Sequence, residues 1–159
     1  MYRYHVPKGY FVTSGRGVDG LSDLNAFDRA LQDADLAGSN LVSVSSIIPK
    51  DAKEVKPVSM LPGSITFCVM SREDGISDEL ISCGLSWGMC KDGDGREYGI
   101  VAEEHGHVTS ESIRKKVKSN LYRMAETRSM DLSNFKTEVI SLKVDEEYGS
   151  VVVIFVYLF

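Results

Sequence analysis

The chain has 159 residues, a length that suits one domain rather than two, since domains usually span roughly 100 to 200 residues. With 43% hydrophobic and 26% charged residues, the composition is that of a folded globular protein and excludes a disordered or fibrous one. The net charge of -5 argues against nucleic-acid binding and is compatible with a cationic ligand.

The first third of the chain predicts a strand, a helix and a second strand. Residues 9–14 are rich in β-branched and aromatic residues, and the glycines that follow are expected to break this strand into a loop. Ser22 can cap a helix that ends near Gly38. The expected apolar stripe of this helix is Leu24, Phe27, Leu31 and Ala34. Residues 40–46 alternate apolar side chains with serine and predict a strand, which Pro49 ends because proline lacks an N–H.

The rest of the chain predicts a loop over 48–63, then further strands and a second helix. The strands are expected at 65–70, 80–89, 98–104, 135–144 and 150–158, and Asp-Gly pairs at 74–75, 92–93 and 94–95 predict turns. Residues 110–128 predict a helix whose apolar stripe is Ile113, Val117, Leu121 and Met124. The last strand is apolar almost throughout, which is typical of a strand covered on both faces.

Two helices are too few to cover both faces of one sheet made from all these strands. The sequence therefore predicts an α+β fold, a four-layer α/β/β/α sandwich in which two sheets pack together and each is covered by a helix. No linker divides the chain, so a single domain over residues 1–159 is expected.

Neither a membrane span nor an export signal is readable. The longest apolar run, 151–159, is much shorter than the roughly 20 residues of a membrane helix, and the N-terminal residues lack the apolar segment of a signal peptide. Cys68, Cys83 and Cys90 show no CxxC spacing, which favours free thiols in a reducing compartment. We therefore expect a cytoplasmic protein that binds neither nucleic acid nor a membrane.

Two motifs of familiar catalytic classes are absent, since the sequence holds neither a P-loop nor an HExxH motif. His105 and His107 would share one face of a strand, so a metal site is an alternative there. Because no third ligand is readable, we expect two ordinary polar side chains and no metal. Ser45 and Ser46 lie where a predicted strand gives way to a loop, and two such serines are by default only turn residues.

Four stretches of the sequence carry a family resemblance. They are LNAFD at 24–28, NLVSVSSIIP at 40–49, LPG at 61–63 and GIVAEEHG at 99–106. With these motifs the chain closely resembles the pyruvoyl-dependent arginine decarboxylases, and the order of helices and strands fits that family to the C-terminus. The resemblance implies a self-processing enzyme that converts L-arginine to agmatine and carbon dioxide.

In that family a serine hydroxyl attacks the carbonyl of the preceding serine and forms an ester. Elimination then gives dehydroalanine, and hydrolysis leaves a pyruvoyl group. By resemblance, Ser46 becomes this covalent cofactor, and Ser45 ends a β chain of residues 1–45 ahead of an α chain of residues 46–159. Asn40 would stabilise the oxyanion through its side-chain amide. No separate cofactor is expected, because the pyruvoyl ketone accepts electrons as carbon dioxide leaves.

The resemblance also implies roles for carboxylates. Glu103 would give a proton to the former α-carbon of the substrate, and Glu104 is the less favoured candidate because neighbours on a strand face opposite sides. Asp28 would bind the arginine guanidinium bidentately, although without the resemblance it would be a solvated helix residue. In the family the sites lie between the subunits of a trimer, so the resemblance implies a homotrimer or a multiple of trimers.

Two alternatives stay open. A related pyruvoyl enzyme would act on histidine or another amino acid, and an assay of carbon dioxide released from a panel of amino acids would separate it. A non-enzymatic trimeric binding protein on the same scaffold would keep Ser46 as an intact serine, which a measurement of intact mass would show.

Overall fold

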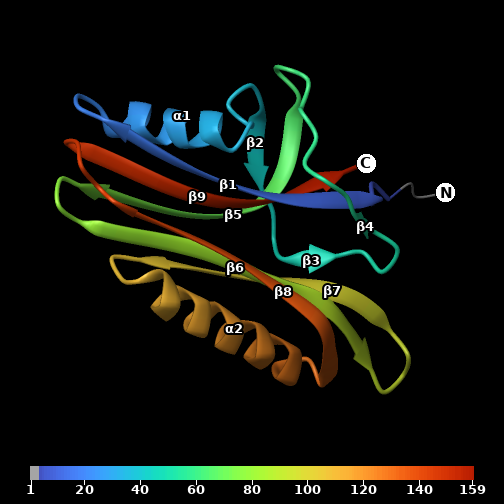
Figure 1. Cartoon of the computed structure of the whole chain (residues 1–159). Coiled ribbons are helices and arrows are strands. Elements are labelled where there is room, and N and C mark those ends of the chain that lie inside the picture. Colours follow the sequence, from blue (N-terminus) through green and yellow to red (C-terminus); the bar gives the residue numbers. More distant parts are fainter. Residues whose placement is uncertain (1–3) are drawn as a thin grey trace.

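The computed structural model describes residues 4–159, and this part of the chain forms two helices and nine strands (Figure 1). In chain order the elements are β1 (Gly9–Asp19), α1 (Asp23–Asp33), β2 (Asn40–Ser43), β3 (Ile47–Ile48), β4 (Lys53–Glu54), β5 (Ile65–Ile76), β6 (Leu80–Asp92), β7 (Glu97–Gly106), α2 (Ser110–Thr127), β8 (Met130–Lys143) and β9 (Tyr148–Leu158). Within residues 4–159, neither helix is both long enough and apolar enough to cross a bilayer.

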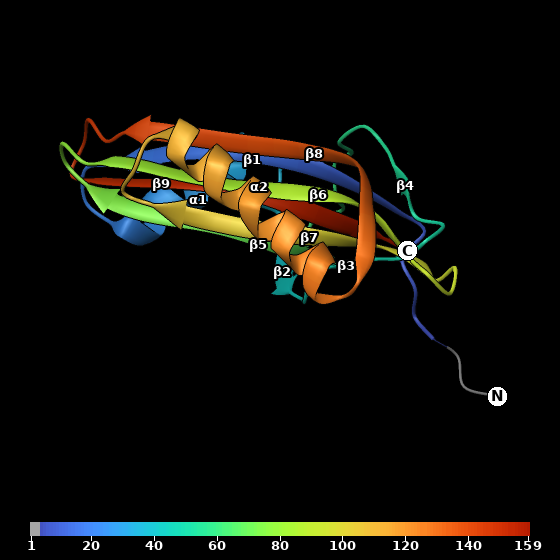
Figure 2. The same cartoon turned by 90° about the horizontal axis from the view of Figure 1, so that it is seen from below.

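Two β-sheets pack face to face between the two helices (Figure 1). The five-stranded sheet has the order β2-β5-β9-β1-β4, and the four-stranded sheet has the order β3-β7-β6-β8. Helix α1 packs on β1 and β9 of the first sheet, and Figure 2 shows α2 crossing the outer face of the second. The predicted α+β fold, a four-layer α/β/β/α sandwich, is confirmed.

The core between the sheets depends strongly on β9. Its residues from Val151 to Tyr157 are all buried, which confirms a strand covered on both faces. Phe155 points toward the second sheet, and its ring lies 4.4 Å from that of Tyr10 and 6.2 Å from that of Trp87, centroid to centroid. Full burial of such a side chain contributes about 1.5–3 kcal/mol, so these rings help to hold the two sheets together.

The three cysteines are small core residues, as the sequence suggested. Cys68, Cys83 and Cys90 are buried and free. Burial raises the pKa of the Cys68 thiol to about 11 and that of Cys83 to about 12, so both stay protonated and unreactive at neutral pH.

Strand β1 is longer than predicted, because two of its glycines serve helix packing instead of starting a loop. Gly15 and Gly17 lie inside β1, where an added Cβ would stand 2.1 Å from the carbonyl oxygens of Ala30 and Ala26, respectively. Only glycine allows this close approach of the α1 backbone. The buried residues of α1 are accordingly Ala26 and Ala30, and its C-cap residue Ala34 is buried as well. The predicted stripe was therefore wrong at Leu24, which is 69% exposed.

Other boundaries were predicted with mixed success. Ser22 caps α1 as expected, since its Oγ accepts a hydrogen bond from the backbone N–H of Asn25 at 3.3 Å. Helix α2 buries Ile113, Val117 and Leu121 as predicted, with Ala125 in place of Met124. The Asp-Gly pair at 74–75 lies inside β5 and makes no turn, because β5 continues along β9 as far as Ile76. Strand β8 begins earlier than predicted, at Met130.

The predicted strand at 40–46 is shorter than expected, and its last three residues, 44–46, belong to neither sheet. Strand β2 stops at Ser43 and runs parallel to β5, whereas Ile47 and Ile48 form β3, which pairs antiparallel with β7. Residues 44–46 therefore cross from one sheet to the other, as Figure 1 shows between β2 and β3. The two serines thus lie in the passage between the layers of the sandwich.

Candidate active site

Backbone hydrogen bonds fix the passage that contains the two serines. The carbonyl oxygen of Ser45 accepts from the N–H of Ile47 at 3.1 Å, and that of Ser46 accepts from the N–H of Val101 in β7 at 3.0 Å. The hydroxyl of Tyr157 donates to the Ile47 carbonyl at 2.9 Å. Burial raises the pKa of Tyr157 to about 12, so this phenol remains a donor at neutral pH. The carbonyl that a Ser46 hydroxyl would attack is therefore already polarised by a backbone N–H.

Ser46 and Glu103 line the same pocket. This pocket has a volume of about 310 Å³ and lies beside β7 and α2. Helix α2 contributes Asn120, Arg123 and Met124 to it, and β7 contributes two buried apolar residues besides Glu103. Two residues that are far apart in the sequence, and that the resemblance marks as catalytic, thus meet at one cavity.

Ser45 faces a different cavity. A pocket of about 350 Å³ is lined by Ser45, Ile47, Phe67, Tyr157 and Phe159, among others. Its walls are mainly apolar and aromatic. The peptide bond between the two serines therefore lies at the boundary between an apolar pocket and the polar pocket that holds Glu103.

The Glu103 carboxyl has a perturbed titration. Partial burial raises its pKa, and the positive charge available on His105 acts in the opposite direction. The side chain is nonetheless accessible from solvent in the single chain. A carboxyl that stays protonated above its usual range next to an open pocket is suited to donating a proton.

Glu104 lies on the other side of β7, where the strand faces α2. Its Oε2 accepts a hydrogen bond from Nδ2 of Asn120 at 3.0 Å, and its backbone carbonyl accepts from Oγ of Ser71 at 2.7 Å. The alternation predicted for these two glutamates holds, since Ala102 packs with the α2 cluster and Val101 with the core between the sheets. Glu104 is, however, no free surface charge, because it holds an amide that lines the Ser46 pocket.

Asn40 and Asp28 lie away from this pocket within one chain. Asn40 begins β2, at the end remote from Ser45, and its Nδ2 donates to the Gly63 carbonyl at 3.0 Å. Asp28 lies on the outer helix α1 and accepts from Nε2 of Gln32 at 2.5 Å. Neither residue is among those that line the Ser46 pocket.

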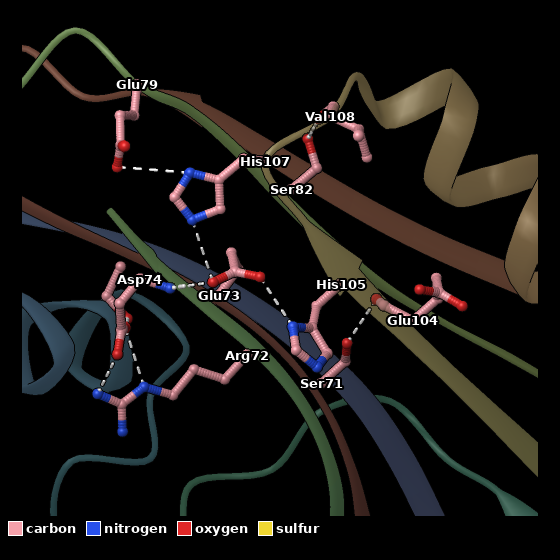
Figure 3. A network of polar contacts seen from close by, with 11 residues as sticks. Ser71, Arg72, Glu73, Asp74, Glu79, Ser82, Glu104, His105, His107 and Val108 are labelled. Atoms are coloured by element: carbon pink, nitrogen blue, oxygen red, sulfur yellow. Dashed lines mark hydrogen bonds and ion pairs between the residues drawn. The ribbon is translucent and has the colours of Figure 1, made fainter. Parts of the chain in front are cut away.

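The two histidines form a chain of ion pairs with carboxylates (Figure 3). Nδ1 of His105 lies 2.8 Å from Oε2 of Glu73, and His107 lies 3.4 Å from both Glu73 and Glu79, through Nε2 and Nδ1 respectively. No group of three such side chains within residues 4–159 converges as metal ligands would. These contacts connect β7 and the residue that follows it to β5 and to the turn after β5.

A larger cleft of about 590 Å³ opens between β1 and β8, at the opposite edge of the sandwich. It contains Trp87, Lys136 and Glu138 but none of the residues to which the resemblance gives a role. The smaller Ser46 pocket is therefore the candidate active site, because it joins the serine to which the resemblance gives the processing role to a carboxyl with a raised pKa.

Sequence reasoning missed three contributors to this site. The Ile47 N–H is a backbone group, so the residue type at position 47 does not indicate that it donates to the Ser45 carbonyl, and only the backbone geometry shows this hydrogen bond. Asn120 and Arg123 lie one turn apart on α2, outside the apolar stripe that the sequence predicted for this helix. Their spacing of three residues was the one readable signal, since it places both on the same face.

The chain is similar to known proteins over nearly its whole length. The family model described as "Pyruvoyl-dependent arginine decarboxylase" matches residues 9–159. A protein of that name from Methanopyrus kandleri is 34% identical over 153 residues, which cover 96% of this chain and 97% of the relative. Relatives with the same name from Methanothermobacter thermautotrophicus and Thermococcus kodakarensis are 32% and 29% identical, over 92% and 95% of this chain and 94% and 97% of their own.

Proposed function

Because the chain belongs to the family of pyruvoyl-dependent arginine decarboxylases, whose cofactor is a covalently bound pyruvoyl group, we propose that it makes that group from Ser46 and converts L-arginine to agmatine and carbon dioxide. The observation that carries this proposal is the pocket shared by Ser46 and Glu103. A pyruvoyl ketone at position 46 supplies a site that takes the substrate amine and accepts electrons when carbon dioxide leaves.

The chain can cut itself at the passage between its sheets. The Ser46 hydroxyl attacks the Ser45 carbonyl, the peptide C–N bond breaks, and the acyl group passes to the Ser46 oxygen. Removal of the Ser46 α-proton then expels the Ser45 carboxylate and leaves dehydroalanine, from which water releases ammonia. The Ile47 N–H, 3.1 Å from the Ser45 oxygen, supports the first step because negative charge develops on that oxygen.

Asn40 is proposed as a second donor to the same oxyanion. Its amide donates to the Gly63 carbonyl in the chain described here, so this role requires it to exchange that partner. The cut would yield a β chain of residues 1–45 and an α chain of residues 46–159 within the one domain of residues 1–159.

Glu103 is proposed to protonate the former α-carbon of the substrate. Decarboxylation replaces the carboxylate by hydrogen, so one proton must be delivered in each turnover. The raised pKa of Glu103 and its position in the Ser46 pocket support this assignment. Asn120 and Arg123 provide hydrogen-bond donors in the same pocket for the oxygen atoms of the substrate.

Asp28 is proposed to bind the guanidinium group from a neighbouring copy of the chain. It lies on the outer helix, outside the Ser46 pocket of its own chain, so a contact with substrate requires a second subunit. Apolar side chains are exposed along the edge that carries β2 and β3, namely Val42, Val44, Ile47 and Ile65. This edge supports an interface, and we propose a homotrimer in the cytoplasm.

Intact mass and carbon dioxide release test the proposal together. Wild-type protein should give two chains and release carbon dioxide from arginine, whereas Ser46→Ala should stay one chain and be inactive. Ser43→Ala, at the exposed end of β2, is the matched control and should still be cleaved. A cleaved Ser46→Ala chain would refute the assignment of Ser46. Release of carbon dioxide from histidine instead of arginine would identify the related activity, and an intact serine would identify a binding protein.

A further inference from the structure

The proposed reaction leaves Glu103 without its proton after each turnover. Arginine becomes agmatine by losing carbon dioxide and gaining one proton at carbon, so the acid that delivers this proton must regain another before the next cycle. If the proposed function holds, a further group must therefore return a proton to Glu103 after each turnover.

His105 occupies the nearest suitable position on β7. It follows Glu103 by two residues, so both side chains leave the same face of the strand, about 7 Å apart at their bases. That face is the one directed at β5, since His105 contacts Glu73 there. The charge of His105 also acts on the titration of Glu103, which places the two groups within electrostatic reach.

Glu73 fixes the orientation of the His105 ring (Figure 3). A carboxylate only accepts hydrogen bonds, so the contact of 2.8 Å with Oε2 of Glu73 places a proton on Nδ1 of His105. Glu73 is itself held, because its other oxygen lies 3.4 Å from Nε2 of His107 and its side chain is only 18% exposed. Such a carboxylate partner selects the tautomer and orientation of an imidazole.

The other ring nitrogen of His105 remains free to exchange protons. Nε2 has no hydrogen-bond partner among residues 4–159, and the His105 side chain is 56% exposed. His107 differs, because both of its ring nitrogens face carboxylates, on Glu73 and Glu79. Of the two histidines, His105 alone therefore combines a fixed ring, an open nitrogen and a position beside Glu103.

We propose that His105, oriented by Glu73, is the shuttle that returns a proton to Glu103 after each decarboxylation. The N–H bond at Nε2 of the imidazolium breaks, the proton passes through a bridging water to the Glu103 carboxylate, and the neutral ring takes a new proton from solvent. No oxidant or reductant is involved, and the net proton consumed is the one that appears in agmatine.

The test compares one turnover with many turnovers in the processed enzyme. In His105→Gln, enzyme in excess over arginine should release carbon dioxide at the wild-type rate, because a single turnover does not require a proton to be returned to Glu103. With arginine in excess, the rate should fall by at least roughly tenfold. Added imidazole should restore the lost rate, since a small base in solution can replace a missing shuttle. Lys115→Gln, at an exposed position of α2 outside the Ser46 pocket, is the control and should stay within about twofold of wild type in both regimes.

Each other outcome overturns the proposal. An unchanged rate with excess arginine would show that Glu103 regains its proton directly from solvent. Equal losses in both regimes, or a loss that imidazole does not restore, would show that His105 only fastens β7 to β5. Failure of the proposed function is seen separately, as wild-type protein that is uncleaved or inactive on arginine. Cleavage of His105→Gln into two chains confirms that the variant has folded.

Discussion

The pair Glu103→Gln and Glu104→Gln tests which face of β7 carries the chemistry. Glutamine keeps the shape of glutamate but cannot deliver a proton at neutral pH, so Glu103→Gln should lower kcat by roughly a hundred- to ten-thousandfold. That loss equals about 2.7 to 5.4 kcal/mol of transition-state free energy. Cleavage at Ser46 should survive, because the proposed processing step uses the hydroxyl of Ser46 and the Ile47 N–H, which donates to the Ser45 carbonyl, rather than Glu103.

Glu104→Gln should be much milder, and the structure sets the size of its effect. The change turns the charge-assisted bond from Asn120, 3.0 Å long, into a bond between neutral groups. Charged bonds contribute about 1.5–3 kcal/mol and neutral ones about 0.5–1.5, so about 1 kcal/mol is lost. This corresponds to roughly a fivefold loss of kcat/KM, through a less well-held Asn120 in the pocket.

The assay is carbon dioxide release from arginine by variants whose two chains have first been confirmed by mass. Because both substitutions replace a carboxyl group on the same strand by an amide, a general effect of losing a carboxyl group there would lower both rates alike. If Glu104→Gln were crippled while Glu103→Gln turned over normally, the assignment of the two faces of β7 would be wrong. If both were active, the proton would come from another group.

Three further predictions concern binding and stability. Asp28→Asn should weaken arginine binding by about ten- to a hundredfold, measured as KM, with cleavage intact; unchanged kinetics would return Asp28 to a solvated helix position. Gly17→Ala should lower the free energy of unfolding, measured with urea, by about 1–3 kcal/mol or more, because its Cβ would stand 2.1 Å from a backbone oxygen of α1. Gly20→Ala is the control and should be nearly neutral, because no atom lies closer than 3.5 Å to the added Cβ. Since the folded-state pKa of Glu103 is raised, its contribution to stability is present below the pKa of the unfolded chain and is lost as pH rises through the folded pKa. In an uncleaved Ser46→Ala background, Glu103→Gln should therefore gain stability relative to its parent as pH rises from acid to neutral; a constant difference would contradict this.

Local sequence patterns were sufficient for most of the fold. The spacing of Ile113, Val117 and Leu121 identified α2, and the continuous apolar run of β9 identified a strand buried on both faces. Ser22 marked the start of α1 through its ability to accept a backbone hydrogen bond. The shortage of helices relative to strands led to the four-layer sandwich, since an uncovered apolar face is costly. These features depend on residues that are neighbours in the chain.

The sequence also carried the candidate site, but only through resemblance to a family. LNAFD and SSIIP pointed to Asp28, Ser45 and Ser46, while no pattern of charge or spacing assigned them a chemical role. Nothing in the sequence separates Glu103 from Glu104 except their alternation along a strand. The structure is what brings Glu103 and Ser46 to one pocket.

Only the tertiary structure decided where the chain changes sheet and which groups meet there. The sequence predicted one strand over 40–46, yet β2 ends at Ser43, because the next residues cross to pair with β7 in the other sheet. Gly15 and Gly17 resembled loop residues, and they lie in β1 because the α1 backbone leaves no room for a side chain. Glu73 meets His105 across two sheets. In each case the deciding contact joins residues that are distant in the chain, and local propensity carries no information about such a partner.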